Sequence, residues 1–199
     1  MRGVFSRGRG LTGRVFLASF LVLLLGAQVW AQSAAMQSGL SWFAGNQAAD
    51  GHWPSAEVGE FHATAEAVKT LTLLNPASPA LTTGRAWLAT QDSSPTDFLA
   101  RSTVAGTGTD IVALLALRAT SGGWGGDTDF AENNLDTPLA LQALKAANHS
   151  DLAVLNPALA YLTTSQNADG GWGFYEEDAS NVYMTAVVSV TLQQFPQMT

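Results

Sequence analysis

The sequence predicts an all-α fold of repeated helical hairpins, and three observations support that prediction. The segment from Gln47 to Trp53, Gln-Ala-Ala-Asp-Gly-His-Trp, recurs from Gln166 to Trp172 as Gln-Asn-Ala-Asp-Gly-Gly-Trp. Apolar residues recur elsewhere at spacings of three and four, which is the period of a helix with one buried face. The spacing from Gln47 to Gln91 is 44 residues, close to the length of repeats built from two helices.

Aligned on the recurring segment, residues 32–199 divide into four repeat units. Each unit has an outer apolar segment, a loop rich in Gly and Asp, and an inner apolar segment. The units span approximately 38–75, 80–105, 109–147 and 152–195. The inner segments are expected at 61–75, 96–105, 135–147 and 182–195. The last of them is rich in valine and could also form a strand, but the repeat favours a helix.

Polar residues stand where the inner helices are expected to begin. Their oxygens can accept hydrogen bonds from the unpaired N–H groups of a first helical turn. These residues are Thr64, Thr96, Asp97, Asp136, Thr137 and Thr185. Pro138 fits a first turn, where its missing N–H does no harm. Pro76, Pro79 and Pro157 are expected in the connections between units.

The first 31 residues predict a secretory signal peptide. Four arginines within residues 2–14 precede an apolar run over residues 15–29, and Val29-Trp30-Ala31 forms a suitable cleavage site before Gln32. The apolar run is shorter than the roughly 20 residues that a bilayer span needs. We therefore expect an exported protein, periplasmic or extracellular, with no stable membrane span after cleavage.

Charge and cysteine content exclude several functions. The whole chain carries a net charge of −7, and the chain after residue 31 has 5 basic and 16 acidic residues, a net charge of −11. Such an acidic surface repels phosphate, so no nucleic-acid partner is expected. The chain has no cysteine, which excludes disulfides, thiolate metal sites and a thiol nucleophile.

The recurring segment is best explained as a joint between helices. Gln at the end of an outer helix can bond free carbonyls there or hold the loop of a neighbouring unit. Gly permits a positive φ, and Trp covers the junction with a large apolar face. The residues assigned to this structural motif are Trp42, Gln47, Asp50, Gly51, Trp53, Trp87, Gln91, Gly123, Trp124, Tyr161, Gln166, Asp169, Gly170 and Trp172.

This motif resembles the QW motif of the squalene–hopene and oxidosqualene cyclases. More broadly it is similar to the α/α-toroid superfamily, which includes protein prenyltransferase β-subunits and the thioester domains of complement and α2-macroglobulin. Units one and four match fully, unit two keeps Trp87 and Gln91, and unit three keeps Gly122-Gly123-Trp124-Gly125 without the Gln. The resemblance covers roughly residues 38–195.

The resemblance implies four hairpins in an incomplete ring, with one helix of each pair inside and one outside. Complete toroids of the superfamily generally have five to seven hairpins, and an open ring leaves the apolar flanks of its terminal units exposed. We therefore expect the chain to be part of a longer protein, or an oligomer partner to close the ring.

The catalytic motifs of the resembled enzymes are missing. The cyclases protonate their substrate with the middle aspartate of Asp-x-Asp-Asp-Thr-Ala, and the matching stretch here puts Leu135 at that position. Asp136 remains only a weak catalytic candidate, because an aspartate in a first helical turn is explained by the helix dipole. Prenyltransferase zinc binding and thioester formation both require a cysteine. No cofactor is expected.

Other polar residues give weaker indications. Asp127, Asp129 and Glu132 are weak calcium candidates in an acidic loop, although their spacing does not match an EF-hand. His52 and His62 have no third metal ligand at a suitable spacing. Arg101 and Arg118 are the only loosely plausible bases for a lyase of toroid type, and we expect both at the surface.

Two functions remain open. We favour an exported, non-catalytic toroid-repeat module that binds a protein, a glycan or an apolar ligand on its concave face. The alternative is a terpenoid cyclase-like enzyme, or a degenerate fragment of one. A closed aromatic cavity with a buried carboxylate would favour the enzyme, and an open groove would favour the binding module.

Overall fold

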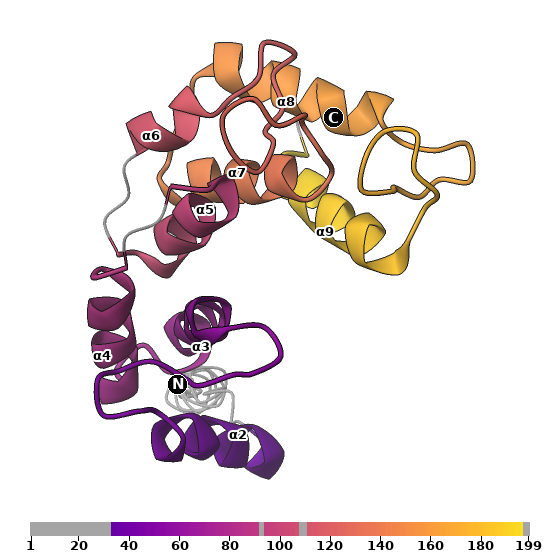
Figure 1. Ribbon diagram of the computed structural model, residues 1–199. Helices are drawn as coiled ribbons and strands as arrows, with labels where there is room; N and C mark the ends of the chain where they lie inside the picture. The colour runs from indigo at the N-terminus through magenta and orange to yellow at the C-terminus, as the bar shows by residue number, and fades with distance from the viewer. Residues whose placement is uncertain (1–32, 92–93, 108–110, 197–199) are drawn as a thin grey trace, which may run out of the picture. The chain divides into compact units, whose positions relative to one another are not determined.

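The computed structural model describes residues 33–91, 94–107 and 111–196, and the secondary structure of these ranges is helical (Figure 1). The helices are α2 (Ala34–Gly45), α3 (Glu60–Leu74), α4 (Pro79–Leu88), α5 (Thr96–Ala105), α6 (Ile111–Ala116), α7 (Asp136–Ala146), α8 (Leu152–Thr164) and α9 (Val182–Gln193). The described ranges contain no strand, only an isolated bridge between Arg118 and Trp124. The predicted all-α class is confirmed, and the valine-rich last segment is a helix.

The chain divides into two compact units, at residues 1–41 and 42–199, with the boundary inside α2. In the first unit the described residues are 33–41, which contribute the larger part of α2. The predicted signal peptide lies outside the described residues. Within the described ranges, no helix is both long and apolar enough to span a bilayer. The second unit carries the features that follow.

The helices of the second unit pack in a regular order. Helices α3, α5, α7 and α9 contact one another in sequence, each against the next. We call them the inner helices, and the helices that precede them the outer helices, after the predicted segments that they cover. Helix α4 packs on α3, α6 on α5 and α8 on α7. Each inner helix before α9 is therefore packed against both helices of the following hairpin.

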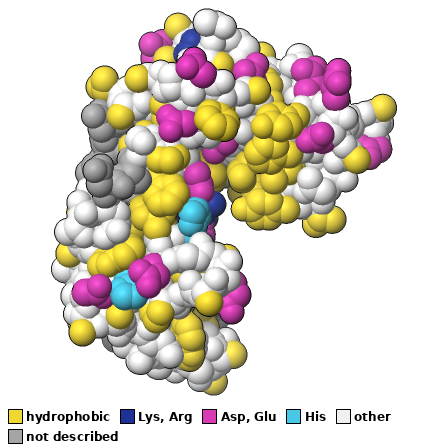
Figure 2. Space-filling model, viewed as in Figure 1, with side chains coloured by type: hydrophobic (Ala, Val, Ile, Leu, Met, Phe, Trp, Pro, Cys, Tyr) yellow, Lys and Arg dark blue, Asp and Glu magenta, His cyan; other side chains and the backbone are white. Residues whose placement is uncertain are grey.

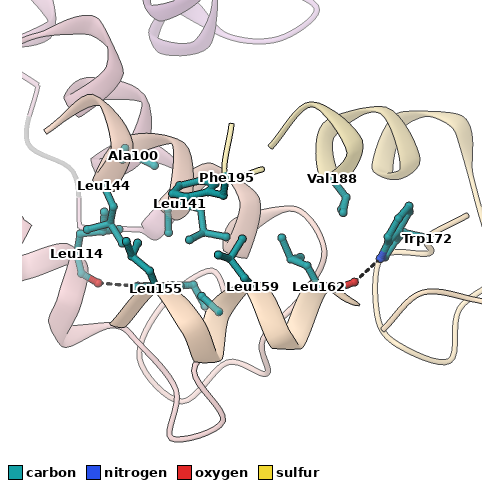
Figure 3. Close-up of a cluster of buried hydrophobic side chains, with 14 of the residues drawn as sticks. Ala100, Leu114, Leu141, Leu144, Leu155, Leu159, Leu162, Trp172, Val188 and Phe195 are labelled. Atoms are coloured by element: carbon teal, nitrogen blue, oxygen red, sulfur yellow. Dashed lines mark hydrogen bonds between the residues drawn. The ribbon is translucent and has the colours of Figure 1, made fainter. Parts of the chain in front are cut away.

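A hydrophobic core joins the last two hairpins (Figure 3). Helix α7 contributes Ala140, Leu141, Ala143 and Leu144, all at 0 % exposure, at the spacing of one helical face. Leucines 155, 159 and 162 of α8 pack against them, again at spacings of four and three. Burial of each leucine side chain contributes about 1.5–3 kcal/mol, so this face fixes the position of α7.

The expectation that Pro157 lies between units is wrong, because Pro157 lies inside α8. A proline there lacks the N–H that would bond the carbonyl of Ala153, four residues earlier. Arg118 supplies a replacement donor, since its guanidinium Nη1 lies 3.3 Å from the Ala153 carbonyl oxygen. Arg118 thus has a structural partner, which leaves the suggestion that it acts as a base without support.

The expectation that threonine hydroxyls cap the inner helices is also wrong. The hydroxyls of Thr64, Thr137 and Thr185 accept hydrogen bonds from a loop tryptophan, and no side-chain cap is found at α3, α5 or α7. Asparagine caps α9 instead, with Asn181 Oδ1 accepting from the N–H of Met184 at 3.0 Å. These three threonine hydroxyls therefore join a loop to an inner helix.

Candidate functional site

Three tryptophans form equivalent joints in units one, three and four. Each indole N–H donates to a carbonyl oxygen ten residues earlier, in the outer helix of the same hairpin. The pairs are Trp53 with Phe43 (2.8 Å), Trp124 with Leu114 (2.7 Å) and Trp172 with Leu162 (2.7 Å). Figure 3 shows the Trp172 ring and this bond. All three side chains are buried.

The same tryptophans are also tied to the inner helices. Their backbone N–H groups donate to the hydroxyls of Thr64, Thr137 and Thr185 at 2.8–3.0 Å. Each tryptophan therefore connects the outer and inner helix of one hairpin. This arrangement supports the structural interpretation of the recurring segment.

The glutamines of the motif bond loops and helix ends. Gln47 Nε2 donates to the Gly51 carbonyl at 2.7 Å and to the Ala80 carbonyl of the next unit at 2.9 Å. Gln166 Nε2 donates to Gly170 at 2.8 Å, which repeats the first of these bonds. Gln91, in the unit that lacks Gly-x-Trp, donates back to Trp87 within its own helix end at 3.2 Å.

The remaining motif residues also have structural contacts. Gly51 and Gly170 have positive φ values of 107° and 85°. Asp169 Oδ1 accepts from the N–H of Gly171 and from Ser180 Oγ, and these bonds lower the pKa of Asp169.

The other motif side chains differ in their surroundings. Asp50 Oδ1 lies 2.6 Å from His52 Nδ1, and the His52 ring lies against Trp87. A Cβ at Gly123 would lie 2.8 Å from Glu132 Cβ, so only glycine fits there. Tyr161 donates its hydroxyl hydrogen to the Glu132 carbonyl, and its burial raises its pKa. Trp42 is 60 % exposed.

A groove of about 760 Å³ lies among the inner helices, within the size range of ligand sites. Residues of α3, α5, α7 and α9 form its walls, together with Val58 from the loop before α3. The lining residues are Val58, His62, Ala63, Glu66, Lys69, Arg101, Leu139, Gln142, Tyr183, Ala186, Val187 and Val190. We call this feature the inner groove.

The repeat itself places these residues in the inner groove. Relative to the joint threonines Thr64, Thr137 and Thr185, lining residues recur at three positions. The position two residues before the threonine is occupied by His62 and Tyr183. The position two residues after it is occupied by Glu66, Leu139 and Val187, and the position five residues after it by Lys69, Gln142 and Val190. One face of α3 and one face of α9 therefore line the groove along about two helical turns, while α7 lines it along one turn and α5 contributes Arg101 alone.

The wall formed by α3 and α5 is charged. His62 Nε2 lies 2.6 Å from Asp97 Oδ2, and Arg101 Nε donates to Asp97 Oδ1 at 2.5 Å. Arg101 Nη1 donates to Glu66 Oε1 at 2.7 Å, and Lys69 Nζ lies 3.3 Å from Glu66 Oε2. Burial alone would lower the pKa of Arg101, but the charges of Asp97 and Glu66 raise it. We call these five residues the charged wall; four of them line the inner groove, and Asp97 binds His62 and Arg101.

The charged wall differs in accessibility along its length. The Arg101 side chain is 14 % exposed, whereas those of Glu66 and Lys69 are 51 % and 52 % exposed. Arg101 is therefore committed to holding α3 and α5 together. Glu66 and Lys69 can form ion pairs with a ligand in the inner groove.

The wall formed by α7 and α9 is mostly apolar. Tyr183, Ala186, Val187 and Val190 of α9 face the inner groove together with Leu139 of α7. Tyr183 and Val190 are 56 % and 55 % exposed. Figure 2 shows hydrophobic side chains gathered over α9, with His and Lys or Arg side chains nearby. We call these five residues the apolar wall.

Asp136 is buried and is not among the residues that line the inner groove. It is 5 % exposed, and its Oδ2 accepts from Asn133 Nδ2 at 2.6 Å. Burial raises the pKa of Asp136, with a further increase from the charge of Asp97, while the Asn133 bond and Arg101 oppose the change. Leu135, at the position of the cyclase proton donor, packs partly buried against the hydrophobic core.

The weak calcium candidates are not brought together. Among the described residues, no group of three His, Asp or Glu side chains could hold a metal ion. Asp127 Oδ1 instead accepts from the N–H of Thr128, Asp129 is exposed with a φ of 67°, and the Glu132 carbonyl binds Tyr161.

Sequence reasoning missed the charged wall. It named His62 and Arg101 separately, and assigned neither to a site with Glu66 or Lys69. The pairs His62–Asp97 and Glu66–Arg101 each join residues 35 positions apart, so no local motif contains them. The signal available in the sequence was that the residues lining the groove stand at repeated positions relative to Thr64 and Thr185.

Comparison with known proteins does not extend this description. No family model matches the chain, and no curated protein matches it.

Proposed function

We propose that this chain is an exported, non-catalytic helical-repeat module of α/α-toroid type that binds an amphipathic ligand in the inner groove. The observation that carries the proposal is the division of the groove into a charged wall and an apolar wall. Exposed apolar patches bordered by polar residues are typical of binding sites. A ligand with one polar and one apolar side satisfies both walls at once.

The features of the inner groove favour binding over cyclisation. A cyclase stabilises carbocations with aromatic rings in a dry cavity. Tyr183 is the one Phe, Tyr or Trp residue among the described residues that line the groove, and its exposure keeps that part of the groove wet. The charged wall would also be poorly suited to a hydrocarbon substrate.

The proposal can be tested with 1-anilinonaphthalene-8-sulfonate, whose rings suit the apolar wall and whose sulfonate suits Lys69. We expect the dye to bind the folded protein and Val190→Asp to weaken binding about tenfold, because it places a charge in the apolar contact. The matched control is Val112→Asp on α6, since Val112 is 76 % exposed and does not line the groove. Equal dye affinity of the two variants would contradict the proposal, provided that both unfold at the same temperature.

The second candidate function is a terpenoid cyclase-like activity, and the buried Asp136 is the observation in its favour. A carboxyl group with a raised pKa can donate a proton. Incubation with squalene decides between the two: a cyclic product that is lost in Asp136→Asn would overturn the non-catalytic proposal.

A further inference from the structure

The dimensions of the inner groove suit one particular kind of amphipathic ligand. Its lining positions recur at spacings of four and three residues along α3 and α9, over about 10 Å of helix axis, and stand three residues apart on α7. A helix lying alongside these helices would present its own side chains at the same spacing. Helices that bind grooves do so through residues at positions i, i+3 or i+4, and i+7.

Resting on the proposed function, we propose that the inner groove binds an amphipathic α-helix of a partner protein. The partner helix lies along the groove, with an aliphatic stripe against the apolar wall and a stripe of both charge signs against α3.

The composition of the apolar wall supports an aliphatic partner stripe. Leu139, Ala186, Val187 and Val190 offer aliphatic carbon, and Tyr183 is the one flat ring of the apolar wall. Helix α9, from Val182 to Gln193, contains no charged residue, so it can pack against a second helix without leaving a buried charge. A glycan would instead need flat rings on which to stack, and hydrogen-bonding groups along the wall.

The exposed charges of α3 determine which polar side chains the partner helix needs. Glu66 and Lys69 pair with each other one turn apart on α3 and remain about half exposed, whereas the side chain of Arg101, held by Glu66 and Asp97, is 14 % exposed. A partner helix with a basic and an acidic residue one turn apart can pair with both. A strongly cationic helix is repelled by Lys69, and a strongly anionic helix is repelled by Glu66. An anionic lipid surface is repelled by the net negative charge of the chain.

The experiment uses three designed peptides and the full-length protein. The first is an amphipathic helix with a Leu stripe and a polar face of alternating Glu and Lys. The second has the same sequence except that a central Ala is replaced by Pro, which prevents the peptide from forming a helix. The third keeps the Leu stripe but has only Lys on its polar face. Binding is measured by displacement of 1-anilinonaphthalene-8-sulfonate and by the gain in helical circular dichroism.

We expect the first peptide to displace the dye and to gain helicity. Its affinity should be about tenfold higher than that of the proline-containing peptide and, in salt that screens the net negative charge of the chain, than that of the Lys-only peptide. Val190→Asp should weaken it about tenfold, and Val112→Asp should leave it unchanged. Glu66→Lys should shift the preference towards a peptide with only Glu on its polar face, which a purely apolar contact would not do.

Two results would overturn the inference. One is equal affinity for the helical and the proline-containing peptide, because the bound form would then not be a helix. The other is displacement of the dye by a maltooligosaccharide while no peptide competes; in that case the inner groove is still a binding site, and only the partner helix is wrong. If the dye itself does not bind the groove, the proposed function fails together with the inference.

Discussion

Replacement of Trp124 by phenylalanine should lower the free energy of unfolding by about 2–3 kcal/mol. The indole N–H donates to the Leu114 carbonyl at 2.7 Å, and the ring is fully buried. Loss of one buried hydrogen bond costs about 1 kcal/mol. The smaller phenyl ring leaves unfilled space in the core, which costs a further 1–2 kcal/mol or so.

The assay is urea denaturation followed by far-ultraviolet circular dichroism. Trp53→Phe and Trp172→Phe should show similar losses, because the repeat gives both indoles the same type of acceptor. Trp87→Phe is the control, because Trp87 is only half-buried and lies against His52 at the surface; its cost should stay below about 1 kcal/mol. If Trp124→Phe cost no more than Trp87→Phe, the interpretation of the tryptophans as joints would be refuted.

Two further predictions concern burial and close backbone contacts. The pKa of Asp136 is raised in the folded protein, so the folded protein binds the carboxyl proton more tightly than the unfolded chain does. The protonated Asp136 therefore contributes to stability at low pH, and this contribution is lost as pH rises from 3.8 through the raised pKa. Asp136→Asn should remove that decline, and the stability of the variant relative to the wild type should rise with pH in denaturation curves; a constant difference would contradict this. Gly125→Ala should destabilise the fold by about 2 kcal/mol or more in thermal melts, because its Cβ would lie 2.4 Å from the Phe130 carbonyl oxygen. Gly126→Ala should have little effect, since its Cβ would lie 3.7 Å from Asp136, and equal losses in the two variants would argue against the described loop.

The helices could be predicted from the sequence because local periodicity determines them. The helical period and the recurring Gln-to-Trp segment predicted an outer and an inner helix in each of four units, and the described residues contain eight helices. The same signals failed at Pro157, which is tolerated inside α8 because Arg118, from another helical unit, bonds the carbonyl that the proline leaves free. The threonines were misassigned as caps because their partners, the loop tryptophans, lie 11 to 13 residues away in sequence.

The candidate site could be predicted only in part. Single residues such as His62 and Arg101 were visible as polar residues in apolar segments. Their assembly with Asp97 and Glu66 depends on the packing of α3 against α5, which a single sequence does not reveal. The apolar wall was hidden for a different reason, because Val187 and Val190 resemble ordinary core residues of a valine-rich helix until their exposure is known.

The central claim is that the inner groove is the ligand site, and methyl NMR during a titration with the mixed-charge helical peptide tests it most directly. The account predicts chemical-shift changes at the methyl groups of Val187, Val190 and Leu139, which line the groove, and none at Val112 on α6. Changes centred on Val112 or on other surfaces, with the methyl groups of the groove unaffected, would contradict it.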